Sequence, residues 1–123
     1  MTKTKDFGER FANPLIEQNG KFLDRNKDLY GPDIVSDYAI DFIQRNKEKP
    51  FFLYYPMLLV HDPFVPTPDS KEWNDPNSRY KKNNIFFKDM VEYMDKIIGK
   101  IVQELKTQGI EDNTLIMFVG DNG

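Results

Sequence analysis

The sequence predicts an α/β protein built around a βαβ unit of parallel strands flanked by helices. Two almost continuous apolar runs, at residues 51–60 and 114–119, are typical of strands buried on both faces, as in a parallel sheet. Between them, apolar residues recur every three or four positions from Phe86 to Leu105, which indicates a long amphipathic helix. A strand, a crossover that contains a helix, and a second strand form a right-handed βαβ unit with parallel strands.

The composition is that of a globular protein with a single core. The 123 residues are 39% hydrophobic and 30% charged, and a domain of this length buries roughly two thirds of its unfolded surface. A net charge of -3 provides no basic face for nucleic acid. The longest apolar run is about half the length of a membrane-spanning helix, so a soluble chain with no membrane partner is expected. The absence of cysteine excludes disulfides, thiolate metal sites and cysteine nucleophiles.

Residues 1–32 form a weakly patterned arm within a single unit that covers residues 1–123. Asn19-Gly20 lies between two short segments of this arm, and Asn-Gly is the strongest short-range signal for a β-hairpin. The arm is therefore predicted to contain two short antiparallel strands.

A helix is expected from Asp33 to Lys47. Its apolar residues recur at i, i+4 and i+8, each with an adjacent partner, which places them on one stripe. This stripe comprises Ile34, Val35, Tyr38, Ala39, Phe42 and Ile43. Pro32 suits the first turn of the helix and Arg45 suits the last turn.

The first apolar run is expected to be a strand as far as Tyr55, because Pro56 cannot donate a ladder hydrogen bond. Residues 61–83 contain four prolines and many turn formers. An irregular loop longer than about 15 residues is usually functional or disordered. Trp73 and Tyr80 could form part of a substrate rim, although a solvated loop with aromatic anchors is the more usual account.

The C-terminal ends of the two predicted strands bring polar residues to one edge of the sheet. His61 follows the first strand, and Asp121 and Asn122 follow the second. Ligands bind at this edge in open α/β sheets. Gly109 is placed to cap the intervening helix.

Asp121 and Asn122 offer a carboxylate and an amide oxygen, which suit calcium or magnesium better than zinc. Two ligands cannot complete a calcium site, which takes about six to eight oxygens. Asn-Gly after a strand is also a type I′ hairpin signal, and residue types alone leave the two interpretations about even. The fully apolar strand before them favours metal binding, because hairpin strands more often alternate.

His61 is the only histidine. At a strand end, an imidazole could donate a hydrogen bond to an oxyanion or transfer a proton near neutral pH. Considered alone, a loop histidine satisfied by a backbone carbonyl is favoured roughly two to one.

Three stretches together resemble the sulfatase family. "PFFLYYPMLLVHDPFVPTPD" is similar to the family segment with Pro-Phe-Phe-Leu-Tyr, a short apolar stretch and His-x-Pro. "MVEYMDKIIGKIVQELKTQGIEDNTLIMFVGDNG" is similar to the following family stretch, in which a helix precedes Asp-Asn-Thr, an apolar strand and Asp-Asn-Gly. "YGPDIVSDYAIDFIQRNKEKPFF" resembles the helix before them, so the resemblance covers about residues 13–123.

The resemblance implies part of an alkaline-phosphatase-like sandwich and hydrolysis of sulfate esters, with a formylglycine nucleophile and calcium as the usual metal. It assigns catalytic roles to His61 and Asp121. Asp121 and Asn122 would be metal ligands, with Asp121 also close to the leaving-group oxygen. His61 would contact the sulfate or the bridging oxygen. Asp95 falls where the family often has an Asp, and no chemical role is assigned to it.

Several family motifs are absent from the sequence: the paired N-terminal Asp ligands, Cys/Ser-x-Pro-x-Arg, Gly-Lys-x-x-His and the Lys after Asp-Asn-Gly. The chain is therefore expected to be an internal slice of a sulfatase, inactive alone. A phosphate mono- or diester hydrolase of the same superfamily and a non-catalytic remnant domain stay open as alternatives. The expected partners are a sulfate ester in the full-length parent and further copies of the chain.

Overall fold

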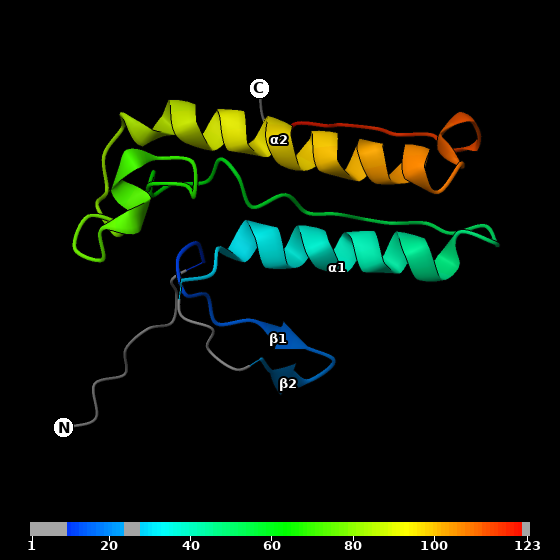
Figure 1. The fold of residues 1–123 in the computed structure, drawn as a ribbon, viewed down its shortest axis with the longest axis horizontal. Coiled ribbons are helices and arrows are strands. Elements are labelled where there is room, and N and C mark those ends of the chain that lie inside the picture. The colour runs from blue at the N-terminus through cyan, green and yellow to red at the C-terminus, as the bar shows by residue number, and fades with distance from the viewer. Residues whose placement is uncertain (1–9, 24–27, 122–123) are drawn as a thin grey trace.

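The computed structural model describes residues 10–23 and 28–121. Its helices and strands, in chain order, are β1 Glu17–Gln18, β2 Lys21–Phe22, α1 Gly31–Asn46 and α2 Phe86–Thr107, with 3₁₀ helices at Lys71–Asn74 and Glu111–Asn113. Figure 1 shows α1 and α2 as two long helices with the β1–β2 hairpin on the outer side of α1. The described chain is thus α/β in the broad sense. Within it, neither helix is long and apolar enough to cross a membrane.

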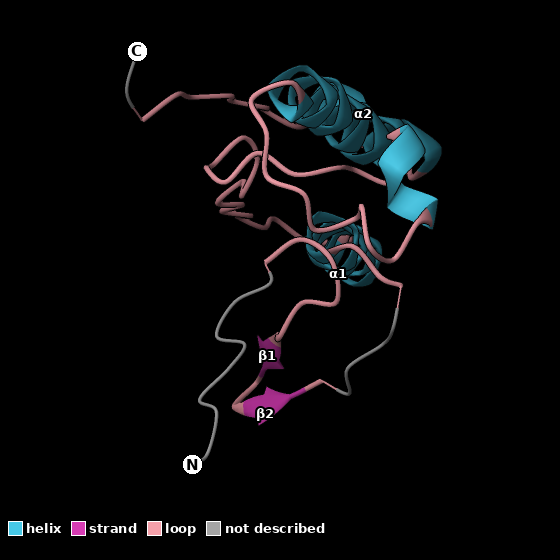
Figure 2. Cartoon of the chain, turned by 90° about the vertical axis from the view of Figure 1, so that its left-hand side faces the viewer, coloured by secondary structure: helices cyan, strands magenta, loops and turns pink. Residues whose placement is uncertain are grey.

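The hairpin predicted at Asn19-Gly20 is confirmed. Strands β1 and β2 pair antiparallel, with Glu17 opposite Phe22. Asn19 and Gly20 have positive φ angles of 54° and 78°, as the two central residues of a type I′ turn do. Figure 2 shows this hairpin beside α1 and away from α2, so it adds little to the core.

The helix predicted from Asp33 is confirmed as α1. Its buried face comprises Gly31, Pro32, Ser36, Ala39 and Ile43. The expected stripe is therefore rotated, because Val35 and Tyr38 are 39% and 44% exposed. Ser36 can replace them in the interior because its hydroxyl donates to the carbonyl oxygen of Asp33 at 2.9 Å, which satisfies the buried polar group.

The long helix predicted after the loop is confirmed as α2. Its buried residues lie on one stripe and comprise Phe86, Met90, Tyr93, Ile97 and Leu105. Gly109 ends the helix as predicted, with a φ angle of +71°. The Gly109 N–H donates to the carbonyl oxygen of Lys106 at 2.9 Å, and the Ile110 N–H donates to that of Leu105 at 3.0 Å. This pair of bonds is a Schellman motif, which favours glycine.

The described residues do not form the predicted βαβ unit of parallel strands, so that prediction is wrong for this part of the chain. The sheet found there is the antiparallel β1–β2 pair. Residues 51–58 and 114–120 are extended, and Figure 1 shows the second segment running back along α2. An apolar run predicts that a segment is buried. A β-ladder also needs a second strand that lies about 4.8 Å from the first. The described residues supply no such neighbour to either segment.

The expectation that both apolar runs are buried on both faces is also wrong. In residues 51–57, alternate side chains are partly buried, whereas Phe52 and Tyr54 are 83% and 77% exposed. In the second run the most exposed side chains are Leu115, Met117, Phe118 and Val119. One face of the first run therefore packs inward, and the second run lies mostly in solvent.

Residues 61–83 are ordered and partly buried rather than a solvated loop. The aromatic anchor expected there is confirmed for Trp73, which is 8% exposed. The Arg79 guanidinium lies 4.7 Å from the Trp73 ring centroid, and its Nε donates to the Trp73 carbonyl oxygen at 2.7 Å. The Ser70 hydroxyl donates to the carboxylate of Asp89 on α2 at 2.5 Å. The Trp73–Arg79 contacts lie within the segment, and the Ser70–Asp89 bond fixes the segment against α2.

Tyr30 lies at the centre of the core. Its ring centroid is 6.1 Å from that of Phe11, 5.4 Å from that of Trp73 and 5.1 Å from that of Tyr93. Its hydroxyl is buried and has no hydrogen-bond partner among the described residues. Burial, followed by the charge of Asp33, raises the pKa of the Tyr30 hydroxyl far above its ordinary value. Tyr30 therefore stays neutral in the core.

The segment at residues 10–13 lies directly against the start of α1. The Gly31 N–H donates to the carbonyl oxygen of Phe11 at 2.7 Å. A Cβ atom at Gly31 would lie 1.9 Å from the carbonyl oxygen of Arg10. No side chain fits at this distance, so the close approach requires glycine.

A side-chain hydrogen bond joins α1 to α2. The Tyr93 hydroxyl lies 2.9 Å and 2.8 Å from the two carboxylate oxygens of Asp33, to which it donates. Burial raises the pKa of Asp33, and the hydrogen bond from Tyr93 opposes this rise. Burial and the same hydrogen bond raise the pKa of the Tyr93 hydroxyl. The bond thus stabilises a carboxylate in a partly desolvated position.

Gly31→Ala is expected to lower the free energy of unfolding by about 1–3 kcal/mol, because the new methyl group collides with backbone. Gly99→Ala is the matched control, since nothing lies within 4 Å of a Cβ at that position in α2. The control should raise stability by about 0.5–1 kcal/mol. Urea unfolding followed by circular dichroism measures both, and equal stability of the two variants would contradict the close approach.

Tyr93→Phe is expected to lower the free energy of unfolding by about 1–3 kcal/mol at neutral pH, because the Asp33 carboxylate loses its donor. Since the folded pKa of Asp33 lies above its ordinary value of 3.8, protonated Asp33 favours folding below that value. This stabilisation disappears as pH rises through the folded pKa.

The loss caused by Tyr93→Phe should therefore be smaller in acid than at neutral pH, because the variant raises the pKa of Asp33 further. Urea unfolding at several pH values tests this, with Tyr54→Phe at an exposed position as the control. A loss of the same size at every pH would show that the hydrogen bond does not favour the charged carboxylate.

Candidate active site

His61 follows the extended residues 51–58 and is exposed. Its backbone N–H donates to the carbonyl oxygen of Leu58 at 3.1 Å, which closes a turn at this point. Its Nδ1 lies 3.1 Å from the Arg10 Nη1 and 2.6 Å from the carbonyl oxygen of Asp62. Both ring contacts found within the described residues involve Nδ1. They do not occupy Nε2, which can still bind a ligand or exchange a proton with it.

Asp121 follows the extended residues 114–120 and is exposed. Asn122, the second predicted metal ligand, lies outside the described residues. The hydrogen-bond contacts of the His61 ring include Arg10 and the carbonyl oxygen of Asp62. The metal and catalytic roles of these residues therefore stay predictions.

The described residues alone do not complete a calcium site. The Asp121 carboxylate is a suitable oxygen ligand for a hard cation. Among the residues that the structure describes, however, no three His, Cys, Asp or Glu side chains are grouped so that they could hold a metal. The donor type fits calcium, whereas the number of donors does not.

Sequence reasoning missed Arg10 as a neighbour of His61. The two residues are 51 positions apart, and nothing in the local pattern of the arm distinguishes this arginine from a surface charge. They meet because residues 10–13 pack against the start of α1. The only local signal is Gly31, which permits that packing.

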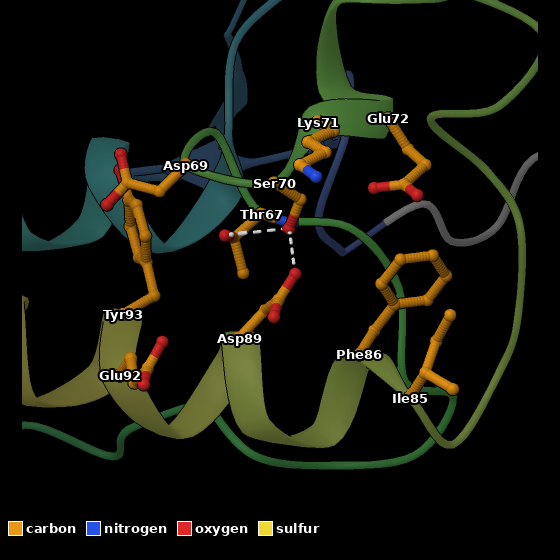
Figure 3. A pocket seen from close by; sticks show the side chains of 10 residues that line it. All are labelled: Thr67, Asp69, Ser70, Lys71, Glu72, Ile85, Phe86, Asp89, Glu92 and Tyr93. Atoms are coloured by element: carbon orange, nitrogen blue, oxygen red, sulfur yellow. Dashed lines mark hydrogen bonds between the residues drawn. The ribbon is translucent and has the colours of Figure 1, made fainter.

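A cavity of about 420 Å³ lies between residues 67–72 and the first turns of α2. Figure 3 shows the Ser70 hydroxyl between Thr67 and the Asp89 carboxylate, which accepts its hydrogen bond. The carboxylates that line the cavity are Asp69, Glu72, Asp89 and Glu92. This excess of negative charge opposes binding of an anionic ester. The Ser70–Asp89 bond instead holds the loop to the helix.

The chain matches the family model described as Sulfatase over residues 4–123. Human Arylsulfatase H is 36% identical to it over 85 residues, which are 69% of this chain and 14% of that protein. The N-acetylgalactosamine-6-O-sulfatase of Bacteroides thetaiotaomicron is 35% identical over 91 residues, which are 74% of this chain and 16% of that protein. A protein named Sulfatase from Formosa agariphila is 27% identical over 131 residues, which are 94% of this chain and 23% of that protein.

The matched segments thus span 14% and 16% of the first two relatives. No solved structure matches the chain significantly. The family model nevertheless covers almost all of the chain, and it confirms the resemblance carried by the motifs around His61 and at the C-terminal end. The chain belongs to the sulfatase family of hydrolases.

Proposed function

We propose that this chain contributes part of the catalytic site of a calcium-dependent sulfuric ester hydrolase. The observation that carries the proposal is the family match over residues 4–123, which includes both extended segments and the polar residues that follow them. His61 would contact the sulfate group. Asp121 and Asn122 would provide two of the metal ligands.

The chemistry of these side chains suits such a site. The exposed imidazole of His61 can donate a hydrogen bond to a sulfate oxygen or transfer a proton to the leaving alcohol. The Asp121 carboxylate can hold a hard cation. Calcium, when bound, would supply positive charge to the sulfate oxygens. The nucleophile and the remaining ligands must come from other residues, because this sequence has no Cys- or Ser-x-Pro-x-Arg motif.

The proposal includes catalytic incompetence of the chain alone. An alkaline-phosphatase-like sandwich would complete the ladders of the two extended segments and bring the missing groups to the site. A phosphate ester hydrolase of the same superfamily is a related alternative, since one oxyanion geometry serves both esters. The nucleophile that distinguishes the two reactions is not in this sequence.

A non-catalytic association domain is the second candidate, and the exposed apolar side chains favour it. Phe52 and Tyr54 are largely in solvent, as are most side chains of residues 115–119. Unpaired extended backbone beside such side chains favours pairing with another chain. The chain is therefore proposed to associate with further copies of itself.

A chimeric enzyme tests the catalytic proposal. The matched segment of the Bacteroides thetaiotaomicron relative is replaced by that of this chain, and hydrolysis of p-nitrophenyl sulfate is measured. His61→Ala and Asp121→Ala should each lower kcat/KM by about 100-fold or more, and chelation by EGTA should remove activity that calcium restores. Asp95→Asn, at an exposed position on α2, is the matched control and should change nothing.

Full activity of the folded His61→Ala chimera would contradict the proposed role of the imidazole. Because the nucleophile of the chimera comes from the relative, only a change in preference reports on this segment: a higher ratio of p-nitrophenyl phosphate to p-nitrophenyl sulfate hydrolysis than in the unmodified relative would favour the phosphate ester alternative. The unmodified relative provides the reference rate for both substrates.

Sedimentation velocity tests self-association of the isolated chain. The average mass should rise with concentration, and Phe52→Ser with Tyr54→Ser should reduce that rise, because the substitutions remove exposed apolar surface. Tyr38→Ser, at a half-exposed position on α1, is the control. A monomer at all concentrations would reject the association domain.

A further inference from the structure

The contact between Arg10 and His61 contains a chemical conflict. Arg10 Nη1 lies 3.1 Å from His61 Nδ1, and the same Nδ1 lies 2.6 Å from the carbonyl oxygen of Asp62. A guanidinium can only donate hydrogen bonds and a carbonyl oxygen can only accept them. One ring nitrogen cannot carry a proton for the carbonyl and a lone pair for the guanidinium at once. Only one of the two contacts is therefore a hydrogen bond at any moment.

Each arrangement leaves one group without a partner on the ring. If Nδ1 accepts from Arg10, the proton of the neutral ring is on Nε2 and the Asp62 carbonyl loses its donor. If Nδ1–H donates to Asp62 instead, the Arg10 N–H faces the ring without an acceptor. The shorter distance, 2.6 Å, favours the bond to Asp62. The Arg10 guanidinium then has a donor to offer to a third group.

Arg10 also differs from the other described arginines in its charge balance. The Arg45 guanidinium pairs with Asp41 at 2.7 Å, and that of Arg79 pairs with Asp28. The ion pairs found within residues 10–23 and 28–121 do not include Arg10. Its guanidinium lies instead beside the imidazole of His61, and no carboxylate of the described residues forms an ion pair with it. An anion that binds here meets an uncompensated positive charge.

The backbone fixes where this charge lies. The Arg10 carbonyl oxygen is packed against Gly31 at the start of α1, and the next residue, Phe11, is buried in the core. The side chains of Arg10 and His61 are both exposed. A rigid backbone thus presents a solvent-accessible guanidinium next to the imidazole, as a binding site for a soluble ligand requires.

We propose that Arg10 is an anion-binding residue of the proposed sulfatase site, and that its guanidinium and the His61 ring bind oxygens of one sulfate group. The proposal rests on the proposed contact between His61 and the substrate. A planar guanidinium can donate two parallel hydrogen bonds to a tetrahedral oxyanion, which an ammonium group cannot do with the same geometry.

Binding would also settle the proton position on the ring. Once the anion accepts from Arg10, His61 Nδ1–H is left to donate to the Asp62 carbonyl oxygen. For the ring to donate to a sulfate oxygen at the same time, Nε2 must also carry a proton, so the anion binds the imidazolium and compensates its charge. Arg10 would in this way hold the sulfate beside a ring whose two nitrogens both donate, and the Nε2 proton is the one available to the leaving alcohol.

The chain itself provides the test, because His61 is its only histidine and gives a single set of ring nitrogen resonances. Long-range ¹H–¹⁵N spectra of the full chain are recorded during titration with phenyl sulfate at constant ionic strength. The His61 resonances should shift saturably toward those of the doubly protonated ring, in which Nδ1–H donates to Asp62 and Nε2–H donates to the sulfate. Arg10→Gln should weaken binding about tenfold, since a hydrogen bond to a charged group is lost. Arg10→Lys should bind with intermediate affinity.

Arg45→Gln is the matched control, because it removes an exposed arginine on α1 without touching His61, and it should leave binding unchanged. Circular dichroism confirms that each variant is folded. Phenyl phosphate is titrated in parallel, and Arg10-dependent binding that favours phosphate over sulfate would overturn the assignment to sulfate esters.

Two further results would overturn the proposal. Equal affinity of wild type and Arg10→Gln, with His61 still shifting, would remove Arg10 from the site but leave the proposed role of His61 intact. No shift of His61 in the wild type would show that the pair does not bind oxyanions in this chain. Hydrolysis by the chimera, which is a separate measurement, decides the proposed function in either case.

Discussion

The aromatic ring of Tyr30 joins three distant parts of the chain. It packs against Phe11 of the arm, Trp73 of the 61–83 segment and Tyr93 of α2. Because Tyr30 directly precedes α1, its burial also fixes where that helix begins. Aromatic pairs contribute about 0.5–1.5 kcal/mol each beyond burial, which is a sizeable share of a domain stability of about 5–15 kcal/mol. Arg10 directly precedes Phe11, and His61 begins the 61–83 segment that contains Trp73. The positions of Arg10 and His61 therefore both depend on the packing of Tyr30.

Elements whose signals are local could be predicted from the sequence. Asn19-Gly20 specifies a turn through its own backbone preferences, and Gly109 ends α2 for the same reason. The helices follow from apolar spacing within one segment. The strands predicted in residues 51–60 and 114–119 are absent from the described structure, because a ladder depends on a neighbour from elsewhere in the fold that the segment itself does not reveal. An apolar run indicates that a segment tends to be buried, but it does not identify the segment against which it packs.

The same distinction applies to the candidate site. His61 and Asp121 stand out because of their residue types and the motifs around them, and the family match supports the motifs. Their roles depend on groups that lie far away in sequence, so spacing alone could not establish them. Arg10 carries no motif at all. Arg10 is identified as a neighbour of His61 only from the structure, in which Gly31 allows the backbone of the arm to approach the start of α1.

Trp73 is the only tryptophan, and its burial gives the protein an intrinsic optical reporter. Its indole packs against the Arg79 guanidinium and against the Tyr30 ring, which is nearly perpendicular to it. Local opening of residues 61–83 would transfer the indole to water and shift its fluorescence to longer wavelength, while the dichroism of the two helices persisted. This segment begins at His61. Tryptophan fluorescence therefore reports local opening of the region beside the imidazole, whereas circular dichroism reports unfolding of the helices.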